Sequence, residues 1–488
     1  MTASRQTIGL VLAAGKGTRL KSDLPKVLHN LLGKPLLVRV IEALLPLQLK
    51  EIVVVVGHQA EAVETALADY ARQVGWKTPL RFLLQQPQLG TGHAVMQLNN
   101  VLAKDEAVDV LITCGDMPLI PTQRYEALMS AYHNHTESML AVATVQYADP
   151  TGYGRVFFDD HDYVHRIVEH KDANAVEQQQ TWCNTGIYLG SWPTLSKTLE
   201  QLGDDNAQQE YYLTDVVALM YKAGKPVQAV RWPDEEDVLG INSRLQLSQA
   251  TSILSRRTAE RLMEEGVSIN QPDSSTFAPE VQVGPDTLIH PGCVLEGPVV
   301  VGQQCEIGPS TTMRGAITIH DHCRIVTAHL EKQVEVASHT YVGPYAHLRD
   351  NASIGPTCRI GNFVEVKEAV IGARSNAAHL CYLGDVDVGD DVNMGAGSIV
   401  ANYDPVRDIK TRSTIETGVK VGCNSVLISP VTLHQDSSVA AGSVITEDVG
   451  SGELAIARCR QSTIEGWVGK AKNTTKTTAS GKPKQPAS

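Results

Sequence analysis

The chain has 488 residues, of which 42% are hydrophobic and 20% are charged, as is ordinary for a folded globular protein. Its formal net charge of −12 argues against a nucleic-acid binder, which usually presents a basic face to phosphates. No apolar run reaches the length of a membrane span, and the first residues lack the layout of a signal peptide. Nine cysteines at irregular spacing, none in a CxxC pair, favour a reducing compartment. We therefore expect a cytoplasmic protein of two or three domains without nucleic-acid partners or membrane insertion.

From residue 8 to about residue 242, short apolar runs alternate with longer amphipathic stretches. Such alternation is typical of a mostly parallel sheet covered by helices, in which ligands bind at the carboxyl ends of the strands. The expected strands are 8–12, 51–56, 81–84, 110–113 and 139–145, and the expected helices include 36–45 and 60–70.

The middle of the chain changes character. Residues 243–265 contain no Pro or Gly, and they predict one long connecting helix that stops at Gly266. The last residues are rich in Lys, Thr, Ser and Pro and have little to bury, so we expect them to be disordered. The expected organisation is a first domain of residues 1–242, a helical linker of 243–266, a second domain of 267–469 and a disordered tail of 470–488.

Beyond the linker, apolar residues recur every six positions in three runs, Phe277 to Ile325, Val336 to Val366 and Ile415 to Ile445. An α-helix cannot keep a six-residue period on one face. A triangular β-solenoid can, with one unit per side and three units per coil, and small residues at its corners would allow tight turns. After Val400 the next in-phase residue is Ile415, so residues 401–414 predict a loop inserted into a rigid scaffold.

A glycine-containing loop, Leu-Ala-Ala-Gly-Lys-Gly-Thr-Arg at 12–19, follows the first expected strand. Its small residues allow backbone N–H groups to approach phosphate oxygens, and we expect a helix N-terminus to add a favourable dipole. Arg19 and Lys26 would add cations for a triphosphate. For the glycines alone, a structural turn is the alternative interpretation.

Two oxygen-bearing side chains follow apolar segments of the first domain. Asp116 ends the run Thr-Cys-Gly-Asp after an expected strand, where it would project into the ligand crevice as a natural Mg²⁺ ligand. A helix N-cap is the alternative role for this Asp. Asn242 ends the domain in a similar way and offers a second oxygen ligand.

Eight segments resemble the sugar-nucleotide pyrophosphorylases, and they occur in the order LAAGKGTRL…DLPKVLH, QLGTGHA, GDMPL, DPTGYGR, VEHKD, NTGIY, EYYLTD and GINSRLQL. Followed by the six-residue repeat, they are similar to the bifunctional N-acetylglucosamine-1-phosphate uridylyltransferase and glucosamine-1-phosphate N-acetyltransferase family over nearly the whole chain. The resemblance implies a Rossmann-like α/β nucleotidyltransferase domain and a left-handed parallel β-helix. It also implies Mg²⁺ as cofactor, with UTP and acetyl-CoA as co-substrates.

The resemblance assigns roles in the first domain. The residues that it places around UTP or the UDP-sugar are Leu12, Ala13, Gly15, Arg19, Lys26, Gln85, Gly90, Thr91, Gly154, Glu169, Asn184 and Asn242. Of these, residues 15–26 would hold the phosphates, residues 85–91 the uracil and residues 154–184 the sugar phosphate, while Asp116 and Asn242 would bind Mg²⁺. Cys114 stands where the family often has Tyr.

Residues that suit an acyl-transfer site cluster between 349 and 403. Arg349 and Lys367 are separated by three six-residue units, which is one complete coil, so we expect them to stack on one edge. Such a pair suits a sugar phosphate, although two solvated surface charges are the alternative. His379 could take a proton from an amine at neutral pH, although a single His among sixteen is usually structural.

By the resemblance, His379 is the catalytic base that deprotonates the amine of glucosamine 1-phosphate. The residues implied to hold this substrate are Arg349, Lys367, Tyr382, Asn393, Asn402 and Tyr403. The residues implied to contact acetyl-CoA are Ala396, Cys423, Ala441 and Arg458. Cys423 stands where the family commonly has Ser, and a thiol is the weaker hydrogen-bond donor.

The resemblance further implies a homotrimer with the acetyl site between subunits, and it leaves open which subunit supplies Asn402 to a given His379. Two other functions fit part of the pattern: a monofunctional pyrophosphorylase with a structural or regulatory β-helix, and a non-enzymatic binding module. His379, Lys367 and the inserted loop count against the first alternative. Arg19, Lys26, Asp116 and the negative net charge count against the second.

Overall fold

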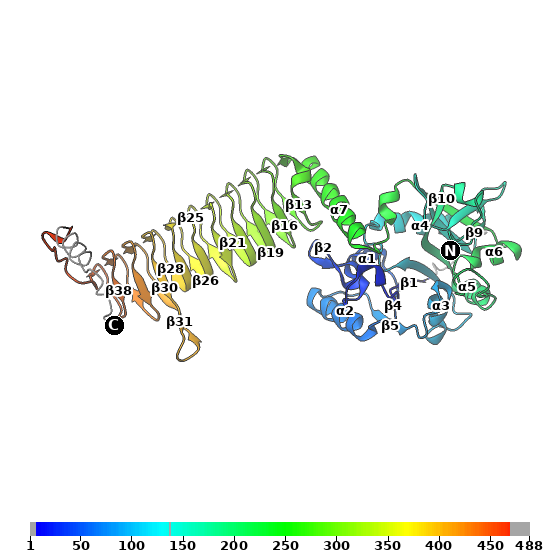
Figure 1. Ribbon diagram of the computed structural model, residues 1–488, viewed down its shortest axis with the longest axis horizontal. Coiled ribbons are helices and arrows are strands. Elements are labelled where there is room, and N and C mark those ends of the chain that lie inside the picture. Colours follow the sequence, from blue (N-terminus) through cyan, green and yellow to red (C-terminus); the bar gives the residue numbers. More distant parts are fainter. Residues whose placement is uncertain (1–5, 136–137, 469–488) are drawn as a thin grey trace, which may run out of the picture. The chain divides into compact units, whose positions relative to one another are not determined.

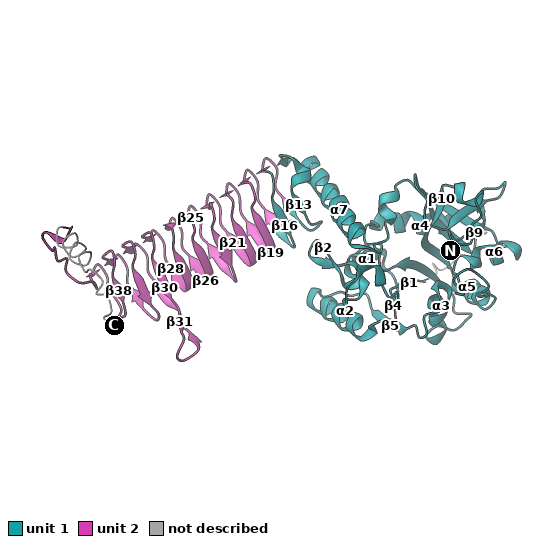
Figure 2. Cartoon of the chain, viewed as in Figure 1, with its two compact units in different colours: residues 1–282, 291–299 teal, residues 283–290, 300–488 magenta. Residues whose placement is uncertain are grey.

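The computed structural model describes residues 6–135 and 138–468 and divides the chain into two compact units (Figure 2). Unit 1 comprises Met1–Gln282 and Pro291–Val299, and unit 2 comprises Val283–His290 and Val300–Ser488. Unit 1 therefore includes the connecting helix and the first short strands after it. The functional boundaries expected at 242, 266 and 469 stay a prediction, and the expected disordered tail of 470–488 lies outside the described residues.

Unit 1 is built on a nine-stranded sheet whose main path runs β11-β7-β10-β6-β1-β4-β5. The strands of this path are β1 (Gln6–Leu12), β4 (Ile52–Val56), β5 (Leu80–Leu84), β6 (Val108–Cys114), β7 (Leu140–Gln146), β10 (Trp182–Ser191) and β11 (Val227–Trp232). All neighbours pair in parallel except β10, which is antiparallel to β6 and β7. Two further strands, β8 (Arg155–Phe158) and β9 (Val164–Val168), form an antiparallel pair beside β10. The mostly parallel sheet predicted from the sequence is confirmed.

Helices cover both faces of this sheet, as Figure 1 shows. They are α1 (Leu36–Leu44), α2 (Ala60–Val74), α3 (Thr91–Met96), α4 (Thr122–Asn134), α5 (Trp192–Leu199) and α6 (Asp215–Lys222). Along β1, Leu10 packs with α3, α5 and α6 in one buried cluster, and Val11 packs with α1, α2 and α4 in the other. Because both faces are buried, the strands are continuously apolar instead of alternating. A two-stranded ribbon, β2 (Asn30–Leu31) and β3 (Lys34–Pro35), precedes α1.

The connecting helix is α7 (Arg244–Glu264), in agreement with the predicted span. The Ser243 side chain caps its first turn by accepting a hydrogen bond from the backbone N–H of Gln246 at 3.2 Å. Gly266 follows with a φ of 96°, the left-handed conformation that glycine adopts most readily after a helix. Within the described ranges, none of the helices combines the length and the apolar character needed to cross a bilayer.

Four short strands follow α7 before the regular part of unit 2: β12 (Ser268–Ile269), β13 (Thr276–Phe277), β14 (Gln282–Val283) and β16 (Val294–Glu296). Unit 2 is a parallel β-helix with three walls (Figure 1). One wall contains β15 (Leu288–Ile289), β18 (Glu306–Ile307), β20 (Arg324–Ile325), β22 (Tyr341–Val342), β25 (Arg359–Asn362), β27 (Asn376–His379), β29 (Asn393–Met394), β34 (Lys420–Val421), β37 (Ser438–Val439) and β39 (Leu454–Ala455).

The second wall contains β19 (Thr312–Ile319), β21 (His329–Val336), β23 (His347–Arg349), β26 (Glu365–Ile371), β28 (Tyr382–Val388), β30 (Ile399–Ala401), β35 (Val426–Ile428) and β38 (Val444–Ile445). The third wall contains β17 (Val299–Val301), β24 (Ala352–Ile354), β33 (Ser413–Ile415) and β36 (Thr432–Leu433), together with the ends of the longer strands of the second wall.

The six-residue rhythm marks the residues that fill the interior of the β-helix. Every in-phase apolar residue of the three runs is buried, and the most exposed of them, Val283, shows only 7% of its surface. The rhythm slips between Ile325 and Val336 because one coil is a residue shorter. In the strand register Ile325 pairs with Val342, one position short of three complete six-residue units. The β-helix predicted from the sequence is confirmed.

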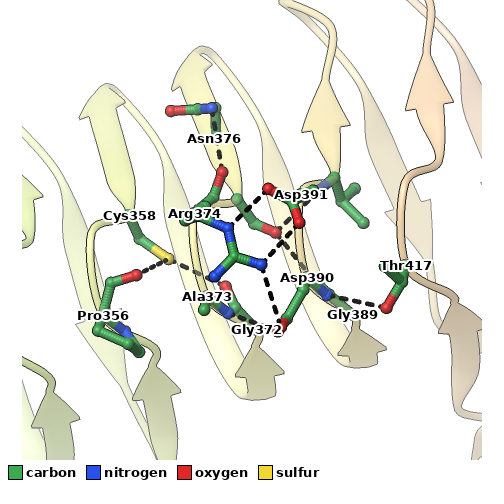
Figure 3. A network of polar contacts seen from close by, with 12 residues as sticks. Pro356, Cys358, Gly372, Ala373, Arg374, Asn376, Gly389, Asp390, Asp391 and Thr417 are labelled. Atoms are coloured by element: carbon green, nitrogen blue, oxygen red, sulfur yellow. Dashed lines mark hydrogen bonds and ion pairs between the residues drawn. The ribbon is translucent and has the colours of Figure 1, made fainter.

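The corners of the β-helix differ from the expectation of small residues. Many corner residues with positive φ are large and polar, including His322, Thr357, Arg374 and Asp391. The reason is visible in Figure 3, where polar side chains tie successive coils together. The Arg374 guanidinium donates to both carboxylate oxygens of Asp391, at 2.8 and 2.7 Å. Hydrogen bonds from these side chains stabilise the corner turns, in place of the small residues expected to relieve steric strain.

The predicted inserted loop is a hairpin of β31 (Tyr403–Asp404) and β32 (Ile409–Lys410), which projects from the β-helix in Figure 1. The backbone N–H of Thr411 donates to the Asn402 carbonyl at 2.9 Å and closes the base of the hairpin. The regular coil resumes at β33. The interruption in the six-residue rhythm therefore correctly predicted the position of this hairpin.

Candidate active sites

The loop after β1 forms one side of a cavity of about 480 Å³ in unit 1. Gly17 has a φ of 61°, and a Cβ there would lie 2.6 Å from the Cβ of Lys26, so only glycine fits beneath that lysine. The loop leads into a single 3-10 turn, Thr18–Leu20, and not into an α-helix. The expected contribution from a helix dipole is therefore wrong, because a single turn sums few peptide dipoles. Backbone N–H groups and cations are what the loop offers to phosphates.

Lys26 contacts two residues that are far from it, and from each other, in the sequence. Its Nζ lies 2.5 Å from Oδ2 of Asp116 and 3.0 Å from Oδ1 of Asn242. Asp116 lies two residues beyond the end of β6, and Asn242 lies two residues before the start of α7. The backbone N–H of Ile241 donates to the Asp116 carbonyl at 2.9 Å and fixes the two segments to each other. A carboxylate and an amide oxygen thus share one cation, and oxygen donors of this kind suit Mg²⁺.

The cavity gathers most of the residues predicted for the nucleotide. Those that line it are Leu12, Ala13, Gly15, Lys26, Gln85, Gly90, Thr91 and Asp116. Arg19 does not line it and is exposed to solvent. Lys16, Gln88 and Glu210 also line it, although no pattern in the sequence selects them. The Gln88 side chain donates to the Ala14 carbonyl and so holds the phosphate loop from the opposite side, a contact without a local sequence signal.

Gln85 and Gly90 shape the far end of the cavity. The Gln85 side chain is 4% exposed and donates to the Gly90 carbonyl at 2.9 Å. Gly90 has a φ of 106°, and a Cβ there would lie 2.7 Å from the Tyr211 carbonyl oxygen. The hydroxyl of Thr91 accepts a hydrogen bond from the backbone N–H of Leu213 at 3.1 Å. The segment that contains Tyr211 and Leu213 therefore packs directly against the residues predicted for the uracil.

The three residues predicted for the sugar phosphate lie together. The backbone N–H of Asn184 donates to the Gly154 carbonyl at 2.9 Å, and a Cβ on Gly154 would lie 3.5 Å from the Glu169 carboxylate. Thr214 donates to Glu169 at 3.1 Å. Burial, helped by neighbouring acidic groups, raises the pKa of Glu169. Because Thr214 directly follows Leu213, one short segment joins this group to the residues around Gly90.

Cys114, which departs from the family pattern, lines the same cavity. Burial raises the pKa of its thiol to about 12, so the side chain stays neutral at physiological pH. Its Sγ lies 3.2 Å from the position that a Cβ on Gly186 would occupy. Cys114 therefore packs against the turn in β10 as a small apolar group.

In unit 2, the predicted base and the predicted acetyl-CoA contacts fall on one corner of the β-helix. Three backbone hydrogen bonds define equivalent positions on successive coils: Gly397 N–H to the His379 carbonyl at 3.3 Å, Asn424 N–H to Ala396 at 2.8 Å, and Gly442 N–H to Cys423 at 2.8 Å. Ala441 directly precedes Gly442, and the Cδ of Arg458 lies 3.8 Å from the position of a Cβ on Gly442. His379, Ala396, Cys423, Ala441 and Arg458 form a row, which we call the corner row.

His379 begins the corner row and is exposed. Within the described part of the chain, its imidazole has no side-chain hydrogen-bond partner. Its carbonyl accepts from the Cys381 thiol at 3.1 Å, a contact that helps to fix the turn between β27 and β28. Cys423, further along the row, is exposed as well. Both side chains are therefore accessible to a ligand along this corner.

The stacking predicted for Arg349 and Lys367 is confirmed by the register of β23 and β26, which pairs them directly. The two side chains differ in their surroundings. Arg349 donates to Glu365 at 2.9 and 2.7 Å and to Asp350 at 2.6 Å, and these carboxylates raise its pKa. Lys367 has no ion-pair partner among the described residues. Lys367 is thus the cation of this pair that is available to an incoming phosphate.

Gly384 continues this column above Lys367, and sequence reasoning missed it. A Cβ on Gly384 would lie 2.5 Å from the hydroxyl oxygen of Tyr382. The Tyr382 side chain therefore folds over Gly384, next to the column of Arg349 and Lys367. A glycine within the repeat was the signal that the sequence offered, because a glycine inside a strand often marks the close approach of another group.

The remaining substrate residues lie on either side of these columns. Asn402 is 6% exposed, and its amide donates to Asp385. Tyr403 is 51% exposed on the hairpin, and its hydroxyl donates to Asp408 at 3.0 Å. Asn393 is exposed and pairs in register with Asn376, which lies on the same strand as His379. Asn402 is thus oriented by its contacts, whereas Tyr403 and Asn393 face solvent.

Comparisons with known proteins agree with the two-domain architecture. The nucleotidyl transferase family model matches residues 8–251, and the model of six bacterial transferase hexapeptide repeats matches residues 280–315. The chain is 40% identical to the bifunctional protein GlmU of Halalkalibacterium halodurans, over 95% of this chain and 99% of the relative. It is 42% identical to that of an Exiguobacterium species, over 95% and 99%, and 43% identical to that of Synechococcus elongatus, over 94% and 97%.

Fold and sites together define a transferase in which a nucleotidyltransferase domain and a hexapeptide-repeat domain share one chain. With relatives of this similarity along almost its entire length, the chain belongs to the family of bifunctional GlmU proteins.

Proposed function

We propose that this chain synthesises UDP-N-acetylglucosamine in two steps, acetylating glucosamine 1-phosphate with acetyl-CoA in unit 2 and transferring uridylyl from UTP to the product in unit 1. The observation that supports this most directly is the coexistence of two chemically different sites. Unit 1 has a cavity lined by Lys26 and Asp116, with Asn242 in contact with Lys26, and unit 2 has a row that begins with an accessible His379. Each site holds the groups that its reaction needs.

Uridylyl transfer needs positioning and charge neutralisation more than proton transfer. An oxygen of N-acetylglucosamine 1-phosphate is already anionic, so it attacks the α-phosphorus of UTP without a general base. A new P–O bond forms as the bond to the β-phosphate breaks, and pyrophosphate leaves. Lys26 and the backbone N–H groups of the loop around Gly15 stabilise the charge on the phosphates.

Asp116 and Asn242 are the residues that would hold Mg²⁺ in this site. When bound, Mg²⁺ supplies further charge neutralisation at the phosphate oxygens. The Lys26 ammonium now contacts both oxygens, at 2.5 and 3.0 Å, so we expect it to move toward the phosphates when the ion binds. Gly154, Glu169 and Asn184 would then hold the sugar phosphate beside the segment that contacts Gly90 and Thr91.

Acetyl transfer requires a base. The imidazole of His379 takes a proton from the 2-amino group, and the nitrogen attacks the thioester carbonyl of acetyl-CoA. An N–C bond forms, the C–S bond breaks, and the departing thiolate of coenzyme A receives a proton. Lys367 binds the sugar phosphate, together with Arg349 once a phosphate competes with its carboxylate partners. Ala396, Cys423, Ala441 and Arg458 would contact the coenzyme along the corner row.

Two substitutions test whether the reactions occupy separate sites. Replacing His379 by Ala removes the base, so acetyl transfer should fall by about 10²–10⁴-fold while uridylyl transfer from N-acetylglucosamine 1-phosphate is retained. Asp116→Asn should do the reverse, because it weakens the cation site and leaves the β-helix intact. Each half-reaction is measured separately, with the exposed His320→Ala and Asp105→Asn as controls. Loss of both activities in a folded single variant would contradict the two-site proposal.

We also propose that the active form is a homotrimer with the acetyl site between subunits. His379 and Tyr403 face solvent in the single chain, as expected of groups that a neighbouring subunit would cover. Sedimentation should give three times the mass of one chain under the conditions of the acetyl-transfer assay. A monomer with full acetyltransferase activity would overturn this part of the proposal.

The compartment we propose is the cytoplasm. All nine cysteines are free thiols, including the exposed Cys423 and Cys459, which fits a reducing environment. We retain residues 1–242, 243–266 and 267–469 as the proposed limits of the uridylyltransferase domain, its helical linker and the acetyltransferase domain. The bounds of α7 support the limits of the linker, and the nucleotidyl transferase match, which ends at residue 251, supports the extent of the first domain.

A further inference from the structure

Three side chains with metal-binding atoms meet on the second wall of the β-helix, beside Arg349 but not themselves among the residues proposed for either reaction. They are His329 and Glu331 on β21 and His347 on β23, and their ligand atoms all lie within 4.8 Å of one another. Nε2 of His347 lies 3.1 Å from one Glu331 carboxylate oxygen, and Nε2 of His329 lies 3.6 Å from the other. We propose that these three residues bind a divalent transition-metal ion of the zinc class.

The strand register explains why the three side chains converge. His329 and Glu331 are two positions apart on one strand, so both point outward while Leu330 between them is buried. His347 pairs directly with His329 on the next coil. Ligands on adjacent parallel strands are held by the ladder itself, which is a more rigid support than a loop.

The spacing of the donor atoms suits a small ion. Bond lengths of about 2.0–2.2 Å to nitrogen and oxygen place tetrahedral ligand atoms roughly 3.4 Å apart. The two distances from Glu331 to the histidines, 3.1 and 3.6 Å, lie on either side of that value. Two imidazoles and one carboxylate form a donor set typical of Zn²⁺ and neighbouring transition metals, whereas Mg²⁺ and Ca²⁺ prefer oxygen alone.

The surroundings leave room for an ion and its remaining ligands. A hollow of about 560 Å³ is lined by all three residues and by the hydroxyl-bearing Ser310, Thr312, Thr327 and Tyr345. The fourth outward position of this patch is Arg349, which pairs in register with Glu331. Its guanidinium is turned to Glu365 and Asp350 and does not occupy the space between the histidines.

The charges of the neighbouring side chains balance. Glu331, Glu365 and Asp350 provide three carboxylates, whereas Arg349 and Lys332, both in contact with Asp350, and Lys367, paired in register with Arg349, provide three cations. The negative charge next to the proposed ion is the Glu331 carboxylate, which lies between the two histidines. The three ligands are between one third and one half exposed, so an ion can reach them from solvent.

The test is a zinc titration of the tag-free, full-length protein, in excess Mg²⁺ to occupy the site at Asp116, with a chromophoric chelator as competitor. The wild type should bind one Zn²⁺ per chain at this site. The double variant His329→Gln, His347→Gln should bind that ion at least about tenfold more weakly. The matched control is His322→Gln, His339→Gln, which removes a stacked histidine pair at another corner, with ring centroids 4.7 Å apart. This control should bind Zn²⁺ like the wild type.

Equal zinc affinity in the wild type and the His329, His347 double variant would overturn the proposal, as would an equal loss in the control. The single variant Glu331→Gln keeps the shape of the site and should also weaken binding, which guards against a folding defect in the double variant. Co²⁺ spectra add an independent measurement. Bands without a thiolate charge-transfer component indicate the proposed nitrogen and oxygen ligands, whereas a dominant thiolate band would assign the ion to cysteines and refute the site.

Discussion

At the scale of single residues, Lys26 shows what the structure adds to the sequence. The sequence alone places Lys26 at the phosphates and assigns Asp116 and Asn242 to a metal ion. In the structure one ammonium contacts both oxygens, so the residues predicted for phosphate and for metal binding share a single charge centre. Any cation that enters between these oxygens must compete with Lys26, which couples ion binding to the movement of that side chain.

Glu169 is a second residue whose chemistry depends on its surroundings. Burial favours its protonated form and raises its pKa, so the folded chain holds this proton more tightly than the unfolded chain. Its contribution to stability is therefore complete below the ordinary Glu pKa of 4.5 and is lost as the pH rises through the raised folded value.

Glu169→Gln should remove this dependence. The free energy of unfolding of the variant should fall less than that of the wild type as the pH rises above 4.5, while uridylyl transfer declines because the sugar contact is altered. Denaturant unfolding at a series of pH values measures the first effect and a pyrophosphate assay the second. The exposed Glu126→Gln serves as control. A variant with the same pH profile as the wild type would show that the buried carboxyl does not titrate in this way.

How far sequence predicts a site is clear from Glu169, Gln88 and Gly384. Glu169 lies in the segment VEHKD, which resembles a motif of the sugar-nucleotide pyrophosphorylases, so the resemblance was enough to locate it. Gln88 acts through a contact with Ala14, 74 residues away in the chain, and such a contact depends on the whole fold, which no local pattern of residues contains. Gly384 differs, because the Tyr382 ring that folds over it lies only two residues away.

At the scale of elements, the six-residue rhythm determines the β-helix more completely than local propensity determines the sheet. Every in-phase residue is buried, whereas the corners hold residues that the rhythm does not specify. The break in the rhythm between Ile325 and Val336 marks a coil that is one residue short of three full units, as the register of Ile325 with Val342 shows. Arg349 and Lys367 stack as predicted because the coil between them is complete.

Each coil of the β-helix should depend for its stability on the residues that it buries in the interior. Leu348 is fully buried between coils, so Leu348→Ala should lower the free energy of unfolding of unit 2 by about 2–5 kcal/mol. Leu380, which is 61% exposed at a corner, is the matched control, and its change to Ala should cost roughly 0.5 kcal/mol or less. Chemical unfolding followed by circular dichroism measures both. Equal effects at the two positions would contradict the assignment of inward and outward faces.

At the scale of the whole molecule, two reactions in one chain explain features that neither domain requires alone. The acetyl-transfer product is the sugar phosphate that the uridylyltransferase site accepts. A monofunctional pyrophosphorylase with a structural β-helix has no need for an exposed His379 aligned with Cys423 along one corner. Nor does it need a lysine at position 367 that lacks an ion-pair partner in the described part of the chain. The hairpin that interrupts the coil after Asn402 likewise has no role in filling the interior.

The most direct measurement supplies the full-length protein with glucosamine 1-phosphate, acetyl-CoA, UTP and Mg²⁺ and follows the products by mass spectrometry. Coenzyme A, pyrophosphate and UDP-N-acetylglucosamine should form in equal amounts, and omission of acetyl-CoA should abolish the release of pyrophosphate. Release of pyrophosphate without acetyl-CoA, with formation of a UDP-sugar that retains a free amine, would contradict the account.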